Sequence, residues 1–149
     1  MMSVNNSLDK LQYLCHIIPP ILEQIPETEF AFKPTSIKWS KKEILGHLID
    51  SATNNHQRFI RIQYENEPVI FYDQNQWNEL SKYNMIDTAQ LILFWKSYNQ
   101  HLIEIIKAIP EENLGKNGIG KDGQSFSLAF YVSDYVEHLE HHLKQIVNY

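Results

Sequence analysis

The sequence predicts an all-α protein, a four-helix bundle formed by a single domain over residues 1–149. Two observations favour this class. Apolar residues recur at the helical period of 3.6 residues in four separate segments, and little of the chain shows the two-residue alternation of a half-buried strand. Four amphipathic helices bury their apolar stripes by packing against one another, which predicts a bundle.

The first helix is predicted over residues 7–25. Asn6 and Ser7 are favourable N-terminal caps, and apolar residues recur at helical spacing after them. Pro19 and Pro20 interrupt this pattern, so we expect a kink or a restart of the helix there.

The second helix has the sharpest beginning in the chain. Ser40 and Glu43 form an S-x-x-E capping box directly before an apolar run, which predicts a helix over residues 41–63. The connection that precedes it is expected to pack Phe30 and Phe32 against the core.

A long connection separates the second helix from the third. Residues 65–84 are polar and aromatic, and they can carry a short helical turn of their own. This connection is long enough to cross the bundle, so the second and third helices need not be antiparallel neighbours. Asp87 caps the third helix, which is predicted over residues 88–109 and stopped by Pro110.

The fourth helix is predicted over residues 126–147, after a glycine-rich connection. That connection contains three of the five glycines, and residues 121–123 favour a turn or a hairpin. Its glycines do not follow a strand in a G-x-G-x-x-G pattern, so a phosphate-binding loop is not expected.

Charge and composition exclude several classes of function. The formal net charge is −5 and no basic stripe is visible, which argues against nucleic-acid binding. No apolar run approaches the roughly 18 residues that span a membrane, and the N-terminus lacks the pattern of a signal peptide. The single cysteine, Cys15, has apolar neighbours, which predicts a buried thiol and suits the reducing cytoplasm.

Three histidines fall within five positions of the last helix. Successive residues turn by about 100° around a helix axis, so His138 and His142 lie about 40° apart on the apolar side. His141 turns about 60° the other way, among charged and polar residues. We therefore expect His141 on the surface and the other two histidines facing inward.

His138 and His142 have the i, i+4 spacing that brings side chains within about 5–6 Å on one face. Two imidazoles so placed can converge on one metal ion. Leu139 stands where an H-E-x-x-H metalloprotease has its glutamate, so this turn contains no general base. The spacing alone leaves a metal site and a pair of hydrogen-bonded structural histidines equally open.

His47 takes the matching position on the second helix, at the edge of an apolar stripe. Ser51, Asn54 and Arg58 continue this edge along the same helix. Such a polar row is either the solvated flank of the helix or the wall of a pocket.

The remaining histidines are weaker candidates. His101 shares the apolar side of the third helix and could approach the site. His16 and His56 have no partner at ligand spacing, so we interpret them as ordinary histidines without a metal.

The chain resembles the DinB/YfiT-like superfamily of metalloenzymes. The resemblance rests on "KWSKKEILGHLIDS" at residues 38–51, "NHQRF" at 55–59 and "YVEHLEHHLKQI" at 135–146, with the glycine-rich connection before the last helix. It covers nearly the whole chain in the family's order, and this combination of motifs is fairly specific.

The resemblance implies a four-helix bundle with one divalent metal held by three histidines. By motif position these map onto His47, His138 and His142, and the ion is of the zinc or nickel kind. Family members are often homodimers. Some are similar to bacillithiol- or mycothiol-dependent S-transferases, which join a low-molecular-weight thiol to an electrophile, but the fold alone does not settle the reaction.

Three functions remain open from the sequence. The first is a metal-dependent thiol transferase for detoxification, in which Ser51, Asn54 and Arg58 orient the small-molecule thiol. The second is a metal-dependent hydrolase of a small substrate, and the third is a metal-binding or partner-binding bundle without catalysis. A carboxylate near the metal favours hydrolysis, whereas a basic polar pocket without one favours thiol transfer. Asp50 and Gln145 are candidates to hold the imidazole tautomers.

Overall fold

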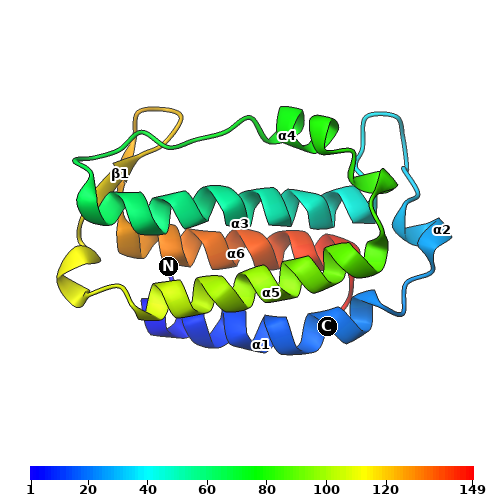
Figure 1. Ribbon diagram of the computed structural model, residues 1–149, viewed down its shortest axis with the longest axis horizontal. Coiled ribbons are helices and arrows are strands. Elements are labelled where there is room, and N and C mark those ends of the chain that lie inside the picture. The colour runs from blue at the N-terminus through cyan, green and yellow to red at the C-terminus, as the bar shows by residue number, and fades with distance from the viewer.

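The computed structural model describes all residues from Met1 to Tyr149 and has the predicted all-α fold. Four long helices form the bundle: α1 (Val4–Leu22), α3 (Lys41–Tyr64), α5 (Thr88–Lys107) and α6 (Leu128–Ile146) (Figure 1). The connections contain the short helices α2 (Glu27–Phe30) and α4 (Gln74–Ser81), the 3₁₀ turns η1 (Tyr83–Met85) and η2 (Glu111–Asn113), and the strands β1 (Asn117–Ile119) and β2 (Ser125–Ser127).

The four helices do not alternate in direction. The colours of Figure 1 show that α3 and α5 run one way along the bundle and that α1 and α6 run the other way. Helix α3 packs against both α5 and α6, and α1 packs against the same two helices. The long connection 65–87 therefore crosses the bundle, and α3 and α5 are parallel neighbours, as the length of the connection allows.

The core lies between the four long helices and contains large aromatic side chains. Trp95, Tyr135 and Phe59 are almost fully buried there. Two of these residues are linked by buried hydrogen bonds: the Tyr135 hydroxyl donates to Asn99 Oδ1 at 2.5 Å, and Asn99 Nδ2 donates to the Trp95 carbonyl at 2.9 Å. These bonds satisfy Tyr135 and Asn99, whereas the buried Trp95 Nε1 has no hydrogen-bond partner.

Helix α1 begins and ends earlier than the sequence predicts. Ser3 is its N-cap and accepts a hydrogen bond from the Asn6 amide, so the predicted capping role of Asn6 and Ser7 is wrong. Pro19 and Pro20 lie inside the last turn of the helix, which ends at Leu22. The helix is continuous through both prolines, so the expected restart is not seen. Proline has no N–H, so the Cys15 and His16 carbonyls lack their usual i+4 donors, and the helix ends two residues later.

Phe30 and Phe32 have different environments. Phe30 is fully buried at the end of α2, as expected, whereas the Phe32 side chain is 64% exposed, so the prediction for Phe32 is wrong. Residues two positions apart on a helical turn point about 200° from each other, so only one of them can face the core.

The capping box at the start of α3 is present as predicted. Ser40 Oγ accepts from the Glu43 amide at 3.0 Å, and Glu43 Oε2 accepts from the Ser40 amide at 3.4 Å. Asn78 Nδ2 also donates to the Glu43 carbonyl at 2.8 Å, and Asn84 Nδ2 donates to Glu43 Oε1 at 3.0 Å. Glu43 therefore fixes the crossing connection onto the first turn of α3.

The glycine-rich connection forms a small hairpin. Strands β1 and β2 pair antiparallel, and Gly123 in the turn has a φ of 73°, which favours glycine. Val69 of the crossing connection forms a parallel bridge with Ile119 of β1. The hairpin therefore holds one end of the connection that passes over the α3–α6 groove.

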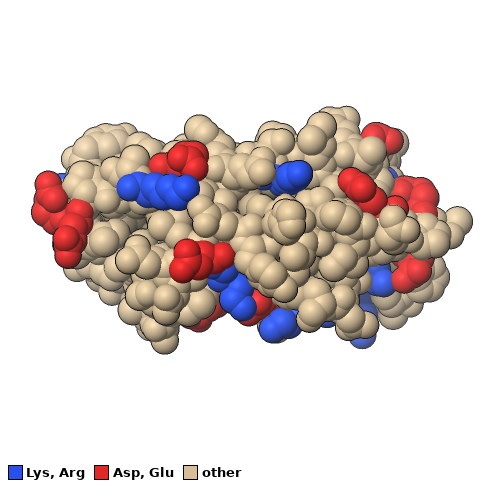
Figure 2. Space-filling view, turned by 90° about the horizontal axis from the view of Figure 1, so that it is seen from below, with Lys and Arg blue, Asp and Glu red and all other residues tan.

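The surface has mixed charge. Figure 2 shows acidic and basic side chains interspersed on the face seen from below, with uncharged areas between them. None of the helices combines the length and apolar character that crossing a bilayer requires.

Candidate metal centre

His47, His138 and His142 meet between α3 and α6. His47 lies one turn after Glu43 on α3, and the other two face it from α6, which runs antiparallel to α3. His47 Nε2 lies 3.3 Å from His138 Nε2, and one ligand nitrogen from each of the three rings lies within 4.8 Å of the others. These are the three histidines that the rotation of about 100° per helical residue places at the apolar sides of the two helices.

The separation of the two Nε2 atoms fits a shared metal ion. With Zn–N bonds of about 2.0–2.1 Å, two tetrahedral ligands are about 3.3–3.4 Å apart. The His47–His138 separation of 3.3 Å has this value. Because neutral imidazoles offer one lone pair each, the three rings are suited to a divalent cation.

The environment keeps these imidazoles neutral. Burial, together with smaller effects of the nearby His138 and His142, lowers the pKa of His47 to about 3. Burial also lowers the pKa of His138 to about 4, with smaller effects from His142, His141 and Arg58. Since metal coordination requires unprotonated nitrogen, the site is prepared for a cation without releasing many protons.

Gln145 and Asp50 were both expected to hold imidazole tautomers, and they behave differently. Gln145 Oε1 lies 3.0 Å from His142 Nδ1, so an Nδ1–H that donates to it leaves Nε2 free for a metal. The Asp50 carboxylate instead accepts a hydrogen bond from the Tyr83 hydroxyl, and its second oxygen is buried without a partner. The expected contact of Asp50 with an imidazole is not formed.

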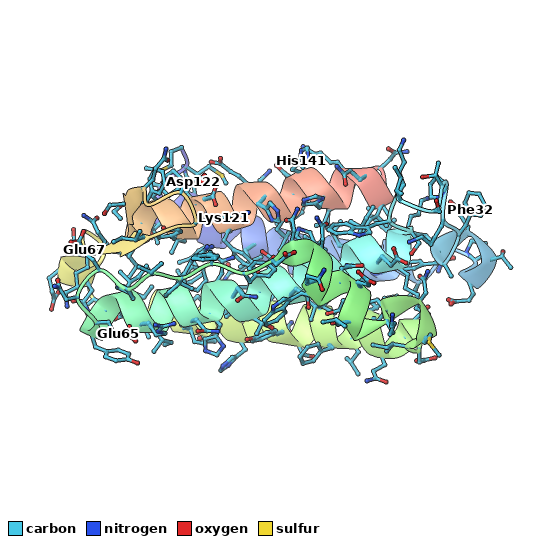
Figure 3. The ribbon with its side chains drawn as sticks, turned by 90° about the horizontal axis from the view of Figure 1, so that it is seen from above. Phe32, Glu65, Glu67, Lys121, Asp122 and His141 are labelled. Atoms are coloured by element: carbon cyan, nitrogen blue, oxygen red, sulfur yellow. The ribbon has the colours of Figure 1, made fainter.

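His141 lies outside the cluster, as expected. It is exposed, and in the view from above it lies on the outer side of α6 (Figure 3). Its Nε2 is 3.3 Å from Gln145 Nε2. His141 therefore contacts a residue that contacts His142, but its ring does not converge with the other three.

Trp39 forms a wall of the site that the sequence did not assign. Its ring centroid lies 5.0 Å from that of His47. Trp39 also borders an open pocket of about 520 Å³ that reaches Gln145 on α6. The other lining residues are Ile37, Lys38, Ile44, Gln74 and Asn75. A small molecule in this pocket would lie beside the histidine cluster.

The predicted polar row on α3 is buried rather than solvated. Ser51 and Asn54 are almost fully buried and Arg58 is half-buried. Asn55 connects two of them, because its Nδ2 donates to Ser51 Oγ at 3.3 Å and its Oδ1 accepts from Arg58 Nη1 at 3.2 Å. Asn54 is not part of this connection, since its side chain donates to the Asp50 carbonyl at 2.9 Å.

Arg58 is held in place by groups from three segments. Its Nη2 donates to the Ile70 carbonyl at 3.1 Å, and its guanidinium carbon lies 4.8 Å from the centre of the Tyr131 ring. Its Nε is buried without a hydrogen-bond partner. Because Arg58 also lowers the pKa of His138, its charge acts on the histidine cluster.

Tyr72 of the crossing connection lies next to the polar row of α3, where it is hydrogen-bonded with Ser51. The pKa of Tyr72 is raised to about 12, mainly by burial and also by Asp50, while Arg58 and a hydrogen bond with Ser51 oppose the increase. The sequence could not assign Tyr72 to the site, because nothing in a polar and aromatic connection shows which helix groove it covers.

A bundle with three buried or half-buried histidines converging between two helices defines the class of a candidate metalloprotein. The DinB superfamily model matches residues 12–146. The chain therefore belongs to the DinB superfamily.

Relatives of this chain are named for metal-dependent hydrolysis. It is 21% identical over 146 residues to a "Putative metal-dependent hydrolase" of Oceanobacillus iheyensis, covering 97% of this chain and 84% of the relative. It is 24% identical over 111 residues to another of Bacillus cereus strain AH820, covering 74% of this chain and 64% of the relative.

Solved structures share the fold. YfiT from Bacillus subtilis, described as "a probable metal-dependent hydrolase with an unusual four-helix bundle topology", has a TM-score of 0.86 at 19% identity, over 96% of this chain and 83% of YfiT. A mycothiol-dependent maleylpyruvate isomerase has a TM-score of 0.79 at 10% identity, over 97% of this chain and 61% of the isomerase. At these identities the likeness shows the fold alone. The relatives' names and the three-histidine cluster together indicate a metal-dependent enzyme fold that uses a divalent metal.

Proposed function

We propose that the protein is a thiol S-transferase in which His47, His138 and His142 hold one zinc or nickel ion. A divalent ion with an open position supplies thiol activation, because coordination removes the thiol proton and the thiolate is the nucleophile. The product would be a thioether between a low-molecular-weight thiol and a small electrophile, as in detoxification.

The charge distribution around the cluster carries this proposal. Among the groups that shift the pKa of the three histidines, Arg58 is the one that is charged at neutral pH, and there is no carboxylate among them. A hydrolase commonly needs a carboxylate or histidine base close to the attacking water. A thiol that loses its proton on coordination needs no such base, so a basic polar site favours thiol transfer.

Arg58, Ser51 and Asn54 are the proposed substrate-binding residues. The unpartnered Nε of Arg58 can donate a charge-assisted hydrogen bond to a carboxylate of the thiol. Ser51 lies one turn from His47 and is connected to Arg58 through Asn55, and Asn54 lies between them on the same helix. These residues would fix the thiol so that its sulfur faces the three imidazoles.

Hydrolysis is the second candidate, and one residue favours it. Asp134 lies one turn before His138 on the same face of α6. Burial raises the pKa of Asp134, and Arg58 opposes that increase. A water molecule between Asp134 and the histidine cluster could lose a proton to this carboxylate, and the relatives named as hydrolases are consistent with that role.

The experiment that separates these functions compares two reactions, thiol transfer and ester hydrolysis. Tag-free protein loaded with zinc or nickel is incubated with bacillithiol, mycothiol, glutathione or cysteine and an aryl halide, and the thioether is measured by absorbance. We expect metal-dependent thioether formation and a higher KM for the thiol in Arg58→Ala. The control Arg61→Ala, whose side chain pairs with Glu65 further along α3, should leave the KM unchanged. Cleavage of a nitrophenyl ester without any thiol would instead support the hydrolase, and the absence of both reactions would support a non-catalytic bundle.

We also propose a cytoplasmic homodimer. The single cysteine, Cys15, is buried and its pKa is raised to about 12 by burial, so it is kept as an unreactive thiol. Leu93 and Phe94 project from α5 with exposed fractions of 65% and 50%. Exposed apolar side chains next to each other on one helix favour a protein partner, and a second copy is the simplest one.

A further inference from the structure

A second pair of histidines lies away from the first cluster, on the α3–α5 side of the bundle. His56 of α3 and His101 of α5 have ring centroids 5.6 Å apart and ring planes at 78°. Within the first cluster the three ring pairs have centroid separations of 4.5 to 5.1 Å and interplanar angles of 71° to 76°. The second pair therefore has an edge-to-face arrangement similar to that of the ring pairs in the first cluster, at a slightly larger separation.

His56 has no histidine at ligand spacing in its own helix, and the packing of α3 against α5 brings His101 beside it. His101, which the sequence allowed to approach the first cluster, contacts His56 instead and is not part of that cluster. Residues distant in sequence become neighbours here because the crossing connection returns the chain to the starting end of α3 before α5 begins.

Hydrogen bonds fix the orientation of the His56 ring. His56 Nδ1 lies 2.8 Å from the Tyr98 hydroxyl, which is also hydrogen-bonded with Thr53. Thr53 uses its own proton to donate to the Ile49 carbonyl at 3.2 Å. When the Tyr98 hydroxyl accepts from His56 Nδ1–H, the lone pair of His56 lies on Nε2 and is available to a metal.

This chain of hydrogen bonds resembles the support that metal-ligating histidines have in proteins, where the second ring nitrogen donates to a fixed acceptor. His56 and Tyr98 are half-buried, whereas His101 is exposed and its ring is free to adjust. Burial and the neighbouring His101 both lower the pKa of His56, so this imidazole is neutral at pH 7. Neither histidine forms an ion pair with a carboxylate.

We propose that His56 and His101 form a second metal-binding site for a divalent transition ion of the zinc, nickel or copper class. His56 Nε2 and one ring nitrogen of His101 are the two protein ligands, and water completes the coordination. Two imidazoles bind such an ion less tightly than three, so this site fills after the first cluster. The proposal does not depend on any catalytic role of His47, His138 and His142.

Metal stoichiometry tests the proposal. Tag-free protein is dialysed to equilibrium against excess zinc, and bound metal per chain is measured by elemental analysis. We expect two zinc ions per chain for the wild type and one for His56→Ala and for His101→Ala. The matched control, His16→Ala on α1, should keep two. If the first cluster does not bind zinc, we expect one zinc ion per chain for the wild type and none for His56→Ala and His101→Ala. The loss of one zinc ion therefore still identifies the second site.

A site-resolved measurement keeps the result independent of folding defects. Small amounts of copper added to ¹⁵N-labelled wild-type protein should broaden the amide signals around His56 and His101, separately from those around His138. Tyr98→Phe, which removes the acceptor for His56 Nδ1–H, should weaken the broadening around His56 and leave that around His138 unchanged. The proposal is overturned if His56→Ala and His101→Ala bind as much zinc as the wild type, or if copper leaves these signals sharp.

Discussion

At the residue scale, the candidate metal centre depends on which histidines face the α3–α6 groove. The 100° rotation per residue was enough to place His138 and His142 inward and His141 outward, because the helix is regular over this stretch. The partners of Asp50 and His56 could not be obtained in this way. Tyr83, which binds Asp50, and His101, which faces His56, belong to other segments whose position depends on the whole fold.

Removing a ligand should release tightly bound metal. His47→Ala, His138→Ala and His142→Ala should each lose the metal that the wild type keeps after dialysis into metal-free buffer, because two imidazoles hold a divalent ion far less well than three. His141→Ala should keep it, since this exposed ring does not converge with the cluster. Elemental analysis measures both outcomes. Loss of metal from His141→Ala with retention by His138→Ala would show that the assignment of faces is wrong.

The metal-free protein should lose stability as the pH falls below 7. The folded pKa of His47 is about 3 and that of His138 about 4, against an ordinary value of 6.5. A depressed folded pKa means that the unfolded chain takes up protons first, so stability present above pH 6.5 is lost as the pH falls toward 4. Thermal melts from pH 8 to pH 4.5 should show this slope. His47→Gln, which cannot titrate, should flatten it, and an unchanged slope would contradict the prediction.

Asp50 should have the opposite effect. Burial raises the pKa of its carboxyl group from 3.8 to about 6, so the folded state favours the protonated form, and this contribution is lost as the pH rises through 6. Asp50→Asn keeps a hydrogen-bond acceptor for Tyr83 without the buried charge. We expect it to raise the free energy of unfolding by about 1 kcal/mol at pH 8. At pH 4 denaturant titrations should show little difference, and destabilisation at pH 8 would refute the argument.

At the element scale, local sequence signals predicted the existence of the four long helices more reliably than the residues at which they begin and end. The capping box at Ser40 places the start of α3 at Lys41, because both of its hydrogen bonds are local. The start of α1 was misplaced because Ser3 is as good a cap as Ser7, and a sequence does not show which one is used. The turn at Gly123 was recognisable from composition. The bridge between Ile119 of the hairpin and Val69 of the crossing connection was not.

The packing of the crossing connection on α3 depends on one glycine. A Cβ at Gly46 would lie 2.1 Å from Tyr83 Cδ2, so the ring packs directly on the α3 backbone one residue before His47. Gly46→Ala must displace Tyr83, and we expect a loss of about 1–3 kcal/mol in the free energy of unfolding. The matched control is Gly115→Ala, because nothing lies within 4 Å of its added Cβ. Denaturant titration of both variants is the test, and equal stabilities would contradict the packing argument.

At the scale of the whole molecule, the direction of the helices creates both histidine sites. Helix α3 is antiparallel to α6 and parallel to α5, so its His47 meets α6 while its His56 meets α5. The sequence predicted four helices and a connection long enough to cross the bundle. It could not show that the connection covers the α3–α6 groove, because the groove exists only after all four helices have packed.

Assembly is the remaining question at this scale, and charge restricts the answer. Each chain has a formal net charge of −5, so two copies repel unless they meet on an uncharged surface. Gln90, Leu93, Phe94 and Ser97 form such a surface on the outside of α5. Its exposed aromatic and aliphatic side chains match the composition of interface centres, and Lys96 lies one turn from Leu93 at the edge of this surface.

We expect light scattering to give the mass of a dimer at micromolar protein concentration. Leu93→Glu should give a monomer, because each dimer would then bury two like charges at one contact. Ile37→Glu is the matched control, since Ile37 is 90% exposed but lies in the connection before α3, away from α5. It should remain dimeric. A monomeric wild type would refute the dimer, and a dimeric Leu93→Glu would place the contact on another face of the bundle.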